Sequence, residues 1–174
     1  AKYLANGKLI GWFQGNMEFS HRALGNRSIL GDPRNPKMKD LVNKAIKFRE
    51  SFRPFAPAVL EKEAHKIFDM KKNDKIFFME KAVKVRKSWR RKIPAVTHVD
   101  GTARVQTVIQ SVNPIFYELI SEFNKITKVP ILLNTSFNLN GEPIVCSPKD
   151  AIRTFFSCGL DVLILGNFLI KKND

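Results

Sequence analysis

The stretch from Gly11 to Arg34 holds the side chains best suited to bind an anion. It contains three arginines, Arg22, Arg27 and Arg34. A guanidinium stays charged, and its planar fork can meet two phosphate or carboxylate oxygens at once. Four glycines and several bulky apolar residues are interspersed with them, which suggests cations held on a packed scaffold. The same arginines could instead pair with nearby carboxylates and backbone carbonyls, and the residue types alone leave both uses open.

Two further cations, Lys47 and Arg53, precede an apolar segment. Prolines bracket Phe55 and favour extended chain around it. We therefore predict a strand over Ala56–Leu60, with the cations at the rim of its sheet. The alternative for Lys47 and Arg49 is a helix end, where Lys and Arg favour the last carbonyls.

A polar row is expected near the Asp-Gly pair at 100–101. This pair is a favoured two-residue turn, and it predicts a hairpin over residues 95–108. Thr102, Arg104 and Gln106 would then share one face of the returning strand. A face of this composition is unusual for a core strand and is typical of a row that faces a ligand.

Another polar group follows the predicted buried strand at 130–133. Asn134, Thr135 and Ser136 come directly after it. Strand ends of this kind often line small-ligand sites, because the carboxyl ends of strands face the crevice of a sheet. The alternative is a turn whose side chains bond their own backbone. His98 could face the same site or simply bond a nearby carbonyl.

Composition indicates one globular domain with an anionic partner. The chain has 174 residues, 44% of them hydrophobic, and a net charge of +14. No apolar run approaches the roughly 20 residues that span a bilayer. The two cysteines, Cys146 and Cys158, lack metal-site spacing, so we expect a reduced, cytoplasmic protein without membrane association. The chain enters a patterned segment at once, which suggests a fragment of a longer polypeptide.

Apolar periodicity predicts alternating strands and helices, and therefore an α/β fold with one twisted, mostly mixed sheet flanked by helices. Strands are expected at 9–13, 28–30, 56–60, 76–85 and 130–133, with a closing hairpin at 161–170. Helices are expected from 36 to 47, 61 to 68, 114 to 128 and 148 to 158, plus one helical turn at 22–27. The expected helix caps are Asn35, Asn113 and a box formed by Ser147 and Asp150.

Residues Lys81 to Lys92 are the most nucleic-acid-like feature of the chain. Seven of these twelve residues are Lys or Arg, and Trp89 lies among them. Charge runs are usually only solvated, so a nucleic-acid partner is not expected. An acidic neighbouring domain is the other alternative. Elsewhere the chain lacks GxxxxGK[ST], GxGxxG, HExxH and GxSxG motifs, so any phosphate would be held by side-chain cations.

Taken together, these segments resemble a known family. GWFQGNMEF, RALGNRSIL, KFRESFRPFAPAVL, IPAVTHVDGTARVQTV, NPIFYELI and VPILLNTSFNLNGEPIVC occur in this order. They are similar to the carboxy-terminal domain of the nodulation-protein-type O-carbamoyltransferases, over nearly the whole chain. The resemblance implies a YrdC-like fold with a large twisted sheet and a basic concave face.

The resemblance also implies a function. Such a domain makes carbamoyl adenylate from ATP and carbamoyl phosphate, with Mg²⁺ on the triphosphate. A separate amino-terminal ASKHA-type domain of the same polypeptide, which carries a metal site, then transfers the carbamoyl group to a sugar or natural-product hydroxyl. No metal site is expected in the present chain. The rival hypothesis is a non-catalytic module that binds RNA or an acidic partner.

Site residues follow by matching motifs. The cations matched to carbamoyl phosphate and nucleotide phosphates are Arg22, Lys47, Arg53 and Arg104, of which the last three are the expected catalytic cations. Asn134 and Ser136 match the polar pair that closes the site, and Arg27, Thr135 and His98 are expected neighbours. One difference stands out, because the family usually has Gly-Pro where this chain has Ser20-His21. The loss of proline removes a fixed φ ahead of Arg22.

Overall fold

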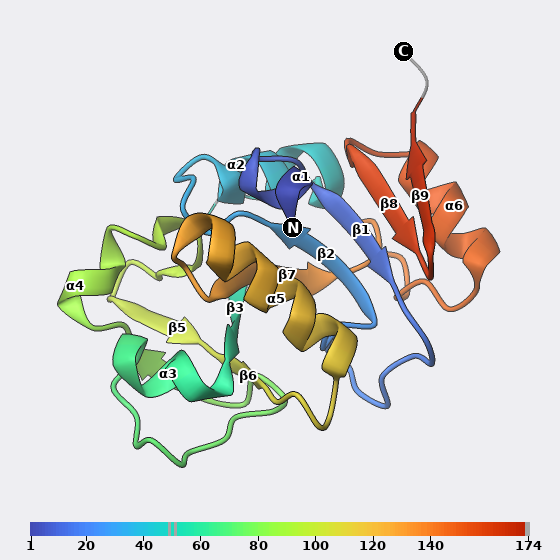
Figure 1. Ribbon diagram of the computed structural model, residues 1–174. Helices are drawn as coiled ribbons and strands as arrows, with labels where there is room; N and C mark the ends of the chain where they lie inside the picture. The colour runs from blue at the N-terminus through green and yellow to red at the C-terminus, as the bar shows by residue number, and fades with distance from the viewer. Residues whose placement is uncertain (49, 51, 173–174) are drawn as a thin grey trace.

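One large mixed β-sheet forms the centre of the molecule (Figure 1). The computed structural model describes residues 1–48, 50 and 52–172. Within them, the strands of this sheet are β1 (Ile10–Phe13), β2 (Arg27–Gly31), β3 (Ala56–Leu60), β6 (Gln106–Val108), β7 (Ile131–Ser136), β8 (Val162–Leu165) and β9 (Phe168–Lys171). Their spatial order is β6-β3-β7-β2-β1-β8-β9. The β3–β6 and β1–β8 pairs are parallel and the other pairs antiparallel, so the predicted α/β class with a mixed sheet is confirmed.

Helices flank this sheet, and a small second sheet lies beside it. The helices are α1 (Lys2–Ala5), α2 (Met38–Val42), α3 (Glu61–Ile67), α4 (Lys87–Arg90), α5 (Pro114–Thr127) and α6 (Pro148–Phe156). A π-helical turn, η1 (Asn43–Lys47), continues α2, and η2 (Pro94–Val96) is a 3₁₀ turn. The second sheet pairs β4 (Ala82–Lys84) with β5 (Thr102–Arg104). None of the helices described is long and apolar enough to cross a bilayer.

Helix α5 covers the central strands, as Figure 1 shows. Its buried stripe is Phe116, Ile120 and Phe123, spaced for one helix face and packed toward β3 and β7. The side chain of Asn113 accepts a hydrogen bond from the Phe116 backbone N–H, which confirms the predicted cap.

Helix α6 begins as predicted but presents a different face. Ser147 and Asp150 form the expected capping box. The sequence pattern predicts that Ile152, Phe155 and Phe156 are buried, but only Phe155 is, since Ile152 is 39% and Phe156 is 57% exposed. The sheet-facing stripe of this helix consists of Ala151, Thr154 and Phe155.

The hairpin predicted over residues 95–108 is wrong. The local turn exists, since His98 N–H donates to Thr102 O at 2.8 Å. The chain before it, however, is the 3₁₀ turn η2, and the chain after it divides between two sheets. β5 pairs with β4, whereas β6 pairs in parallel with β3. Arg104 and Gln106 therefore belong to different sheets.

The strand predicted over 76–85 is also mostly absent, and only Ala82–Lys84 is strand. Thr107 forms hydrogen bonds with both backbone groups of Ile76. Its Oγ1 accepts from Ile76 N–H at 2.9 Å, and its backbone N–H donates to Ile76 O at 2.7 Å. Met79 has a left-handed φ of 57°, which interrupts extended chain. These two features turn Met79 toward the sheet.

Residues 17–26 form a loop, so the helical turn predicted at 22–27 is wrong. The backbone N–H groups of Leu24, Asn26 and Arg27 donate to Glu18 Oε1, at 2.6, 2.7 and 3.2 Å, and not to helical backbone carbonyls. Asn35 is not the cap of α2, which begins at Met38. Its Oδ1 instead accepts from Lys37 N–H in a turn ahead of the helix.

Candidate functional site

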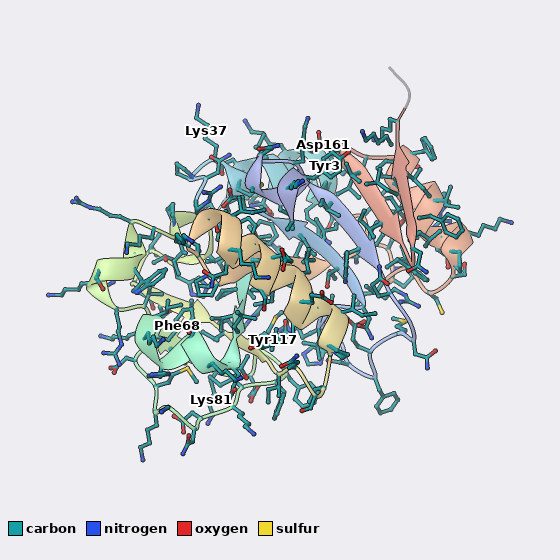
Figure 2. All side chains as sticks on the ribbon, viewed as in Figure 1. Tyr3, Lys37, Phe68, Lys81, Tyr117 and Asp161 are labelled. Atoms are coloured by element: carbon teal, nitrogen blue, oxygen red, sulfur yellow. The ribbon has the colours of Figure 1, made fainter. Side chains whose placement is uncertain are left out.

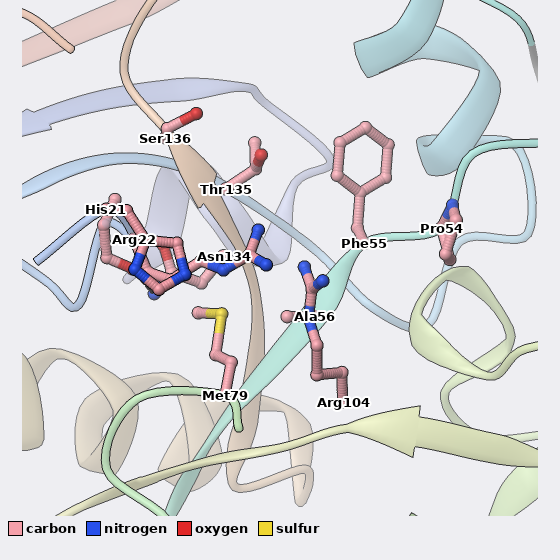
Figure 3. A pocket seen from close by; sticks show the side chains of 11 residues that line it. His21, Arg22, Pro54, Phe55, Ala56, Met79, Arg104, Asn134, Thr135 and Ser136 are labelled. Atoms are coloured by element: carbon pink, nitrogen blue, oxygen red, sulfur yellow. Dashed lines mark hydrogen bonds between the residues drawn. The ribbon is translucent and has the colours of Figure 1, made fainter. Parts of the chain in front are cut away.

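A polar pocket of about 110 Å³ lies where β7 ends and β3 begins (Figure 3). Five separate parts of the chain build it: the loop at 21–23, the start of β3, Met79, Arg104 on β5, and the end of β7. The lining residues are His21, Arg22, Ala23, Pro54, Phe55, Ala56, Met79, Arg104, Asn134, Thr135 and Ser136. The structure thus brings together five of the sequence-predicted site residues: Arg22, Arg104, Asn134, Thr135 and Ser136.

Two guanidinium groups give this pocket its charge. Figure 3 shows Arg104 entering from β5 and Arg22 entering from the loop on the other side. The guanidinium of Arg22 has no hydrogen bond or ion pair with any residue that the structure describes. Among the described residues, the pocket lining contains no carboxylate. An anion is therefore the ligand that the pocket attracts.

Buried amides form one wall of the pocket. Asn134 is 1% exposed, and its Nδ2 donates to Ala23 O at 3.1 Å and to Gln106 Oε1 at 2.8 Å. Gln106 in turn donates from Nε2 to Leu24 O at 2.8 Å. The buried Asn134 Oδ1 has no hydrogen-bond partner among the described residues. Thr135 and Ser136 add hydroxyl groups to the lining.

Lys47 lies beneath this wall rather than in the lining. It is 4% exposed, and its Nζ donates to Ser136 O at 2.7 Å and to Asn138 O at 2.9 Å. It also bonds Ser136 Oγ at 3.2 Å and Asn138 Oδ1. The ammonium thereby fixes the end of β7 that carries the pocket hydroxyls. The helix-end alternative for Arg49 falls outside the described residues.

The other predicted residues lie outside the pocket lining. Arg53 is exposed and pairs with Glu50, with a distance of 2.9 Å between Nε and Oε2. His98 lines a separate hollow of about 300 Å³ with Phe52, and its Nδ1 is 3.1 Å from Thr102 Oγ1. Burial lowers the pKa of His98, and nearby Arg104 lowers it further while Asp100 opposes the shift.

Arg27 and Arg34 serve the scaffold. The Arg27 guanidinium lies 3.4 Å from the Phe13 ring centroid and donates to Gln14 O at 2.8 Å and Gly15 O at 3.0 Å. Burial lowers the pKa of Arg27. Arg34 forms a two-pronged pair with Asp32, and this hydrogen bonding raises the pKa of Arg34. The sequence left open whether these arginines bind an anion or pair within the protein. Arg22 faces the pocket, whereas Arg27 and Arg34 pair within the protein and brace the loop and the strand end.

Sequence reasoning missed several residues of the wall. Phe55 and Ala56 line the pocket because the prolines hold them at the start of β3. Met79 reaches it through a left-handed backbone that no sequence signal announces. His21, for which we expected only a role in filling the turn, also lines the pocket.

The strongest positive charge lies elsewhere, in residues 71–92, which we call the basic lobe. It contains ten Lys and Arg and two carboxylates, a net +8 of the chain's +14. Figure 2 shows Lys81 on the outer side of this lobe, away from the sheet. Trp89 is partly buried, with the Lys92 ammonium 4.7 Å from its ring centroid. The indole is therefore poorly placed to stack on a base.

Comparison with known proteins identifies the family. Residues 1–172 match the family described as Carbamoyltransferase C-terminus. The chain belongs to this family. It is 54% identical over 173 residues to the nodulation protein NolNO of Sinorhizobium fredii, and 51% identical over 173 residues to NolO of Bradyrhizobium diazoefficiens. Both alignments cover 99% of this chain but only 25% and 32% of the relatives. The carbamoyltransferase resemblance read from the motifs is confirmed.

Proposed function

We propose that this chain is the activating part of an O-carbamoyltransferase and forms carbamoyl adenylate from ATP and carbamoyl phosphate. The observation that carries the proposal is the pocket whose described lining residues include Arg22 and Arg104 and no carboxylate, in a chain of the carbamoyltransferase family. Its volume of about 110 Å³ is below the roughly 300–1,000 Å³ typical of pockets for drug-sized ligands. It suits a small acyl phosphate, with the nucleotide extending from its mouth.

The proposed reaction has two steps. Water cleaves carbamoyl phosphate to carbamate and inorganic phosphate. A carbamate oxygen then attacks the α-phosphorus of ATP, the bond to the bridging oxygen breaks, and pyrophosphate leaves. The second step brings two anions together, so it depends on fixed cations that offset their repulsion and on correct orientation.

The residues of the pocket supply these functions. Arg22 and Arg104 would bind the phosphate and stabilise charge that develops at phosphorus. Thr135 and Ser136 would donate hydroxyl hydrogen bonds. Lys47 acts from below, because its bonds to Ser136 and Asn138 hold the strand end in place.

Arg53 would act at the mouth of the pocket. It precedes Pro54, which lines the pocket, and its partner Glu50 forms an exposed ion pair with it. Exposed pairs of this kind contribute only about 0–1 kcal/mol, so Arg53 can exchange Glu50 for a triphosphate at little cost.

Mg²⁺ would enter with the nucleotide. The described residues include no group of three His, Cys, Asp or Glu side chains placed to hold a metal ion. Triphosphate oxygens are natural Mg²⁺ ligands, and the ion usually keeps several waters beside them. When bound, it would neutralise charge on the leaving pyrophosphate.

Transfer to the final hydroxyl would require the rest of a longer polypeptide. The chain spans about a quarter to a third of the length of the curated relatives it matches. We propose that an amino-terminal ASKHA-type domain accepts carbamoyl adenylate and selects the sugar or natural-product hydroxyl.

Pyrophosphate release tests the proposal. The chain is incubated with ATP and Mg²⁺, with and without carbamoyl phosphate, beside Arg104→Met and the matched lobe variant Arg91→Met. We expect release that requires carbamoyl phosphate, falls sharply in Arg104→Met and persists in Arg91→Met. Release that does not depend on carbamoyl phosphate, or its absence in wild-type protein that binds ATP, would contradict activation within this chain.

A further inference from the structure

Two buried amides from non-adjacent strands meet across β3. Asn134 on β7 pairs in register with Ala56 of β3, and Gln106 on β6 pairs with Ala58. Residues in register share a face of the sheet, and Ala56 and Ala58 are two apart, so all four side chains lie on one face. The two alanines carry only a methyl group there. This leaves room for the amides to join at 2.8 Å above β3.

Backbone carbonyls of the Arg22 loop set the direction of both amides. Leu24 O accepts from Gln106 Nε2, so Gln106 must turn its Oε1 toward Asn134. Asn134 must therefore donate from its Nδ2 to Gln106 Oε1, and the same Nδ2 also donates to Ala23 O. Rotating the Asn134 amide by half a turn would place its oxygen next to two other acceptor oxygens, Ala23 O and Gln106 Oε1. Carbonyl oxygens cannot donate, so the direction of the chain of hydrogen bonds is fixed.

One acceptor is left over by this arrangement. Asn134 Oδ1 is buried and has no partner among the described residues, and Asn134 lines the pocket. A buried acceptor without a donor is costly, so a ligand N–H group that reaches this oxygen would be favoured over a group that cannot donate. A methyl group in the same place would leave the penalty in force.

We infer that Asn134 selects the acyl group of the substrate and that Gln106 is its positioning residue. The pocket would prefer an acyl phosphate whose acyl carbon bears an NH₂ group over one that bears a methyl group. This inference rests on the proposed function and adds to it the basis for choosing carbamoyl phosphate over acetyl phosphate. The two ligands have nearly the same shape, so size alone cannot separate them.

Calorimetric titration of the wild-type chain with carbamoyl phosphate, acetyl phosphate and inorganic phosphate, in the absence of ATP, measures this preference. We expect carbamoyl phosphate to bind about tenfold or more tightly than acetyl phosphate. Equal affinity for both acyl phosphates would overturn the inference and leave the proposed function standing. Failure to bind either acyl phosphate would overturn both.

Variants assign the preference to the two amides. Asn134→Leu keeps the size of the side chain and removes the acceptor, so we expect the preference for carbamoyl phosphate to vanish. Gln106→Met removes one of the two groups that orient Asn134, and we expect the preference to fall about threefold or more. The control is Gln14→Met, which removes another buried amide, bonded to Gly166 O at 3.0 Å, away from the pocket.

The control separates positioning from general destabilisation. Gln14→Met should lower thermal stability but keep the wild-type ratio of affinities. A wild-type ratio in Gln106→Met would overturn the positioning role of Gln106, and the same ratio in Asn134→Leu would overturn the selector. If Asn134→Leu does not fold, the wild-type titration and Gln106→Met still decide the matter.

Discussion

The central pocket and the basic lobe are both cationic, but they hold their charge in different ways. The pocket brings Arg22 and Arg104 together beside buried amides at the end of β7. The lobe carries ten Lys and Arg, all exposed except the half-buried Arg90, and its Lys92 ammonium lies 4.7 Å from the Trp89 ring centroid. Charges beside a water-poor wall act at a lower effective dielectric, whereas exposed charges are screened by water and salt. Two placed cations should therefore matter more than ten solvated ones.

The largest effect is expected from Arg104→Met. Loss of one preorganised cation at a phosphate typically costs about 2–4 kcal/mol, which corresponds to roughly 30- to 1,000-fold in rate or affinity. Carbamoyl phosphate affinity, measured by calorimetry, should fall by this amount. Arg91→Met, with the same change in charge, should alter it less than about threefold. Equal losses in the two variants would show that net charge, not the pocket, binds the ligand.

The next effect is expected from Lys47→Met, which tests the support beneath the pocket. Lys47 donates to Ser136 O and Asn138 O from a buried position. Hydrogen bonds of a charged group contribute about 1.5–3 kcal/mol, so the free energy of unfolding in urea should fall by about that much. The exposed Lys44→Met, in the same helical turn, should stay within about 0.5 kcal/mol of wild type. A Lys47→Met protein as stable as wild type would contradict the bracing role.

A smaller effect is expected when the lobe loses charge. Replacing Lys81, Lys84, Lys87 and Arg91 together with Gln should change carbamoyl phosphate affinity by less than about threefold at physiological salt, because screening acts over roughly 8 Å. The association rate at low salt should fall, since a positive surface steers anions toward the protein. Stopped-flow binding at two salt concentrations measures both quantities. A loss of affinity as large as that of Arg104→Met would move the binding site to the lobe.

The smallest effect is expected from His98, which lies in the 98–102 turn and lines a separate hollow. Burial lowers its pKa in the folded protein, so protonation favours the unfolded chain, whose histidines titrate near 6.5. Its contribution to stability is present above pH 6.5 and is lost as pH falls through the lower native pKa. Urea unfolding at pH 7.5 and 5.5 should show a steeper loss in wild type than in His98→Gln. Parallel losses in both proteins would exclude His98 as a source of the pH dependence.

The sequence predicted well wherever one local signal decides the outcome. Periodicity and caps gave α5 and the start of α6, and alternating apolar segments with turn signals gave β1, β3 and the β8–β9 hairpin. The sequence-based predictions failed where pairing with segments distant in the chain decides the structure. The Asp-Gly turn at 100–101 forms, but β4 and β3 compete for the strands that follow it.

The site shows the same limit. Arg22, Arg104 and the residues of β7 that the structure places in one pocket could be named from the family motifs. Their separation from Arg27 could not, because the carbonyls of Gln14 and Gly15 hold the Arg27 guanidinium, whereas the Arg22 guanidinium has no such partner among the described residues. Ala56 and Ala58 leave room for the hydrogen bond between Asn134 and Gln106. Their position beneath it depends on strand register, which a single sequence does not specify.

Nuclear magnetic resonance of the arginine side chains tests the central claim most directly. The Nε–Hε signals of all arginines can be followed during titration with carbamoyl phosphate. We predict saturable shifts at Arg22 and Arg104, with Arg86, Arg90 and Arg91 in the lobe nearly unchanged at physiological salt. Saturable shifts confined to the lobe arginines would contradict the account.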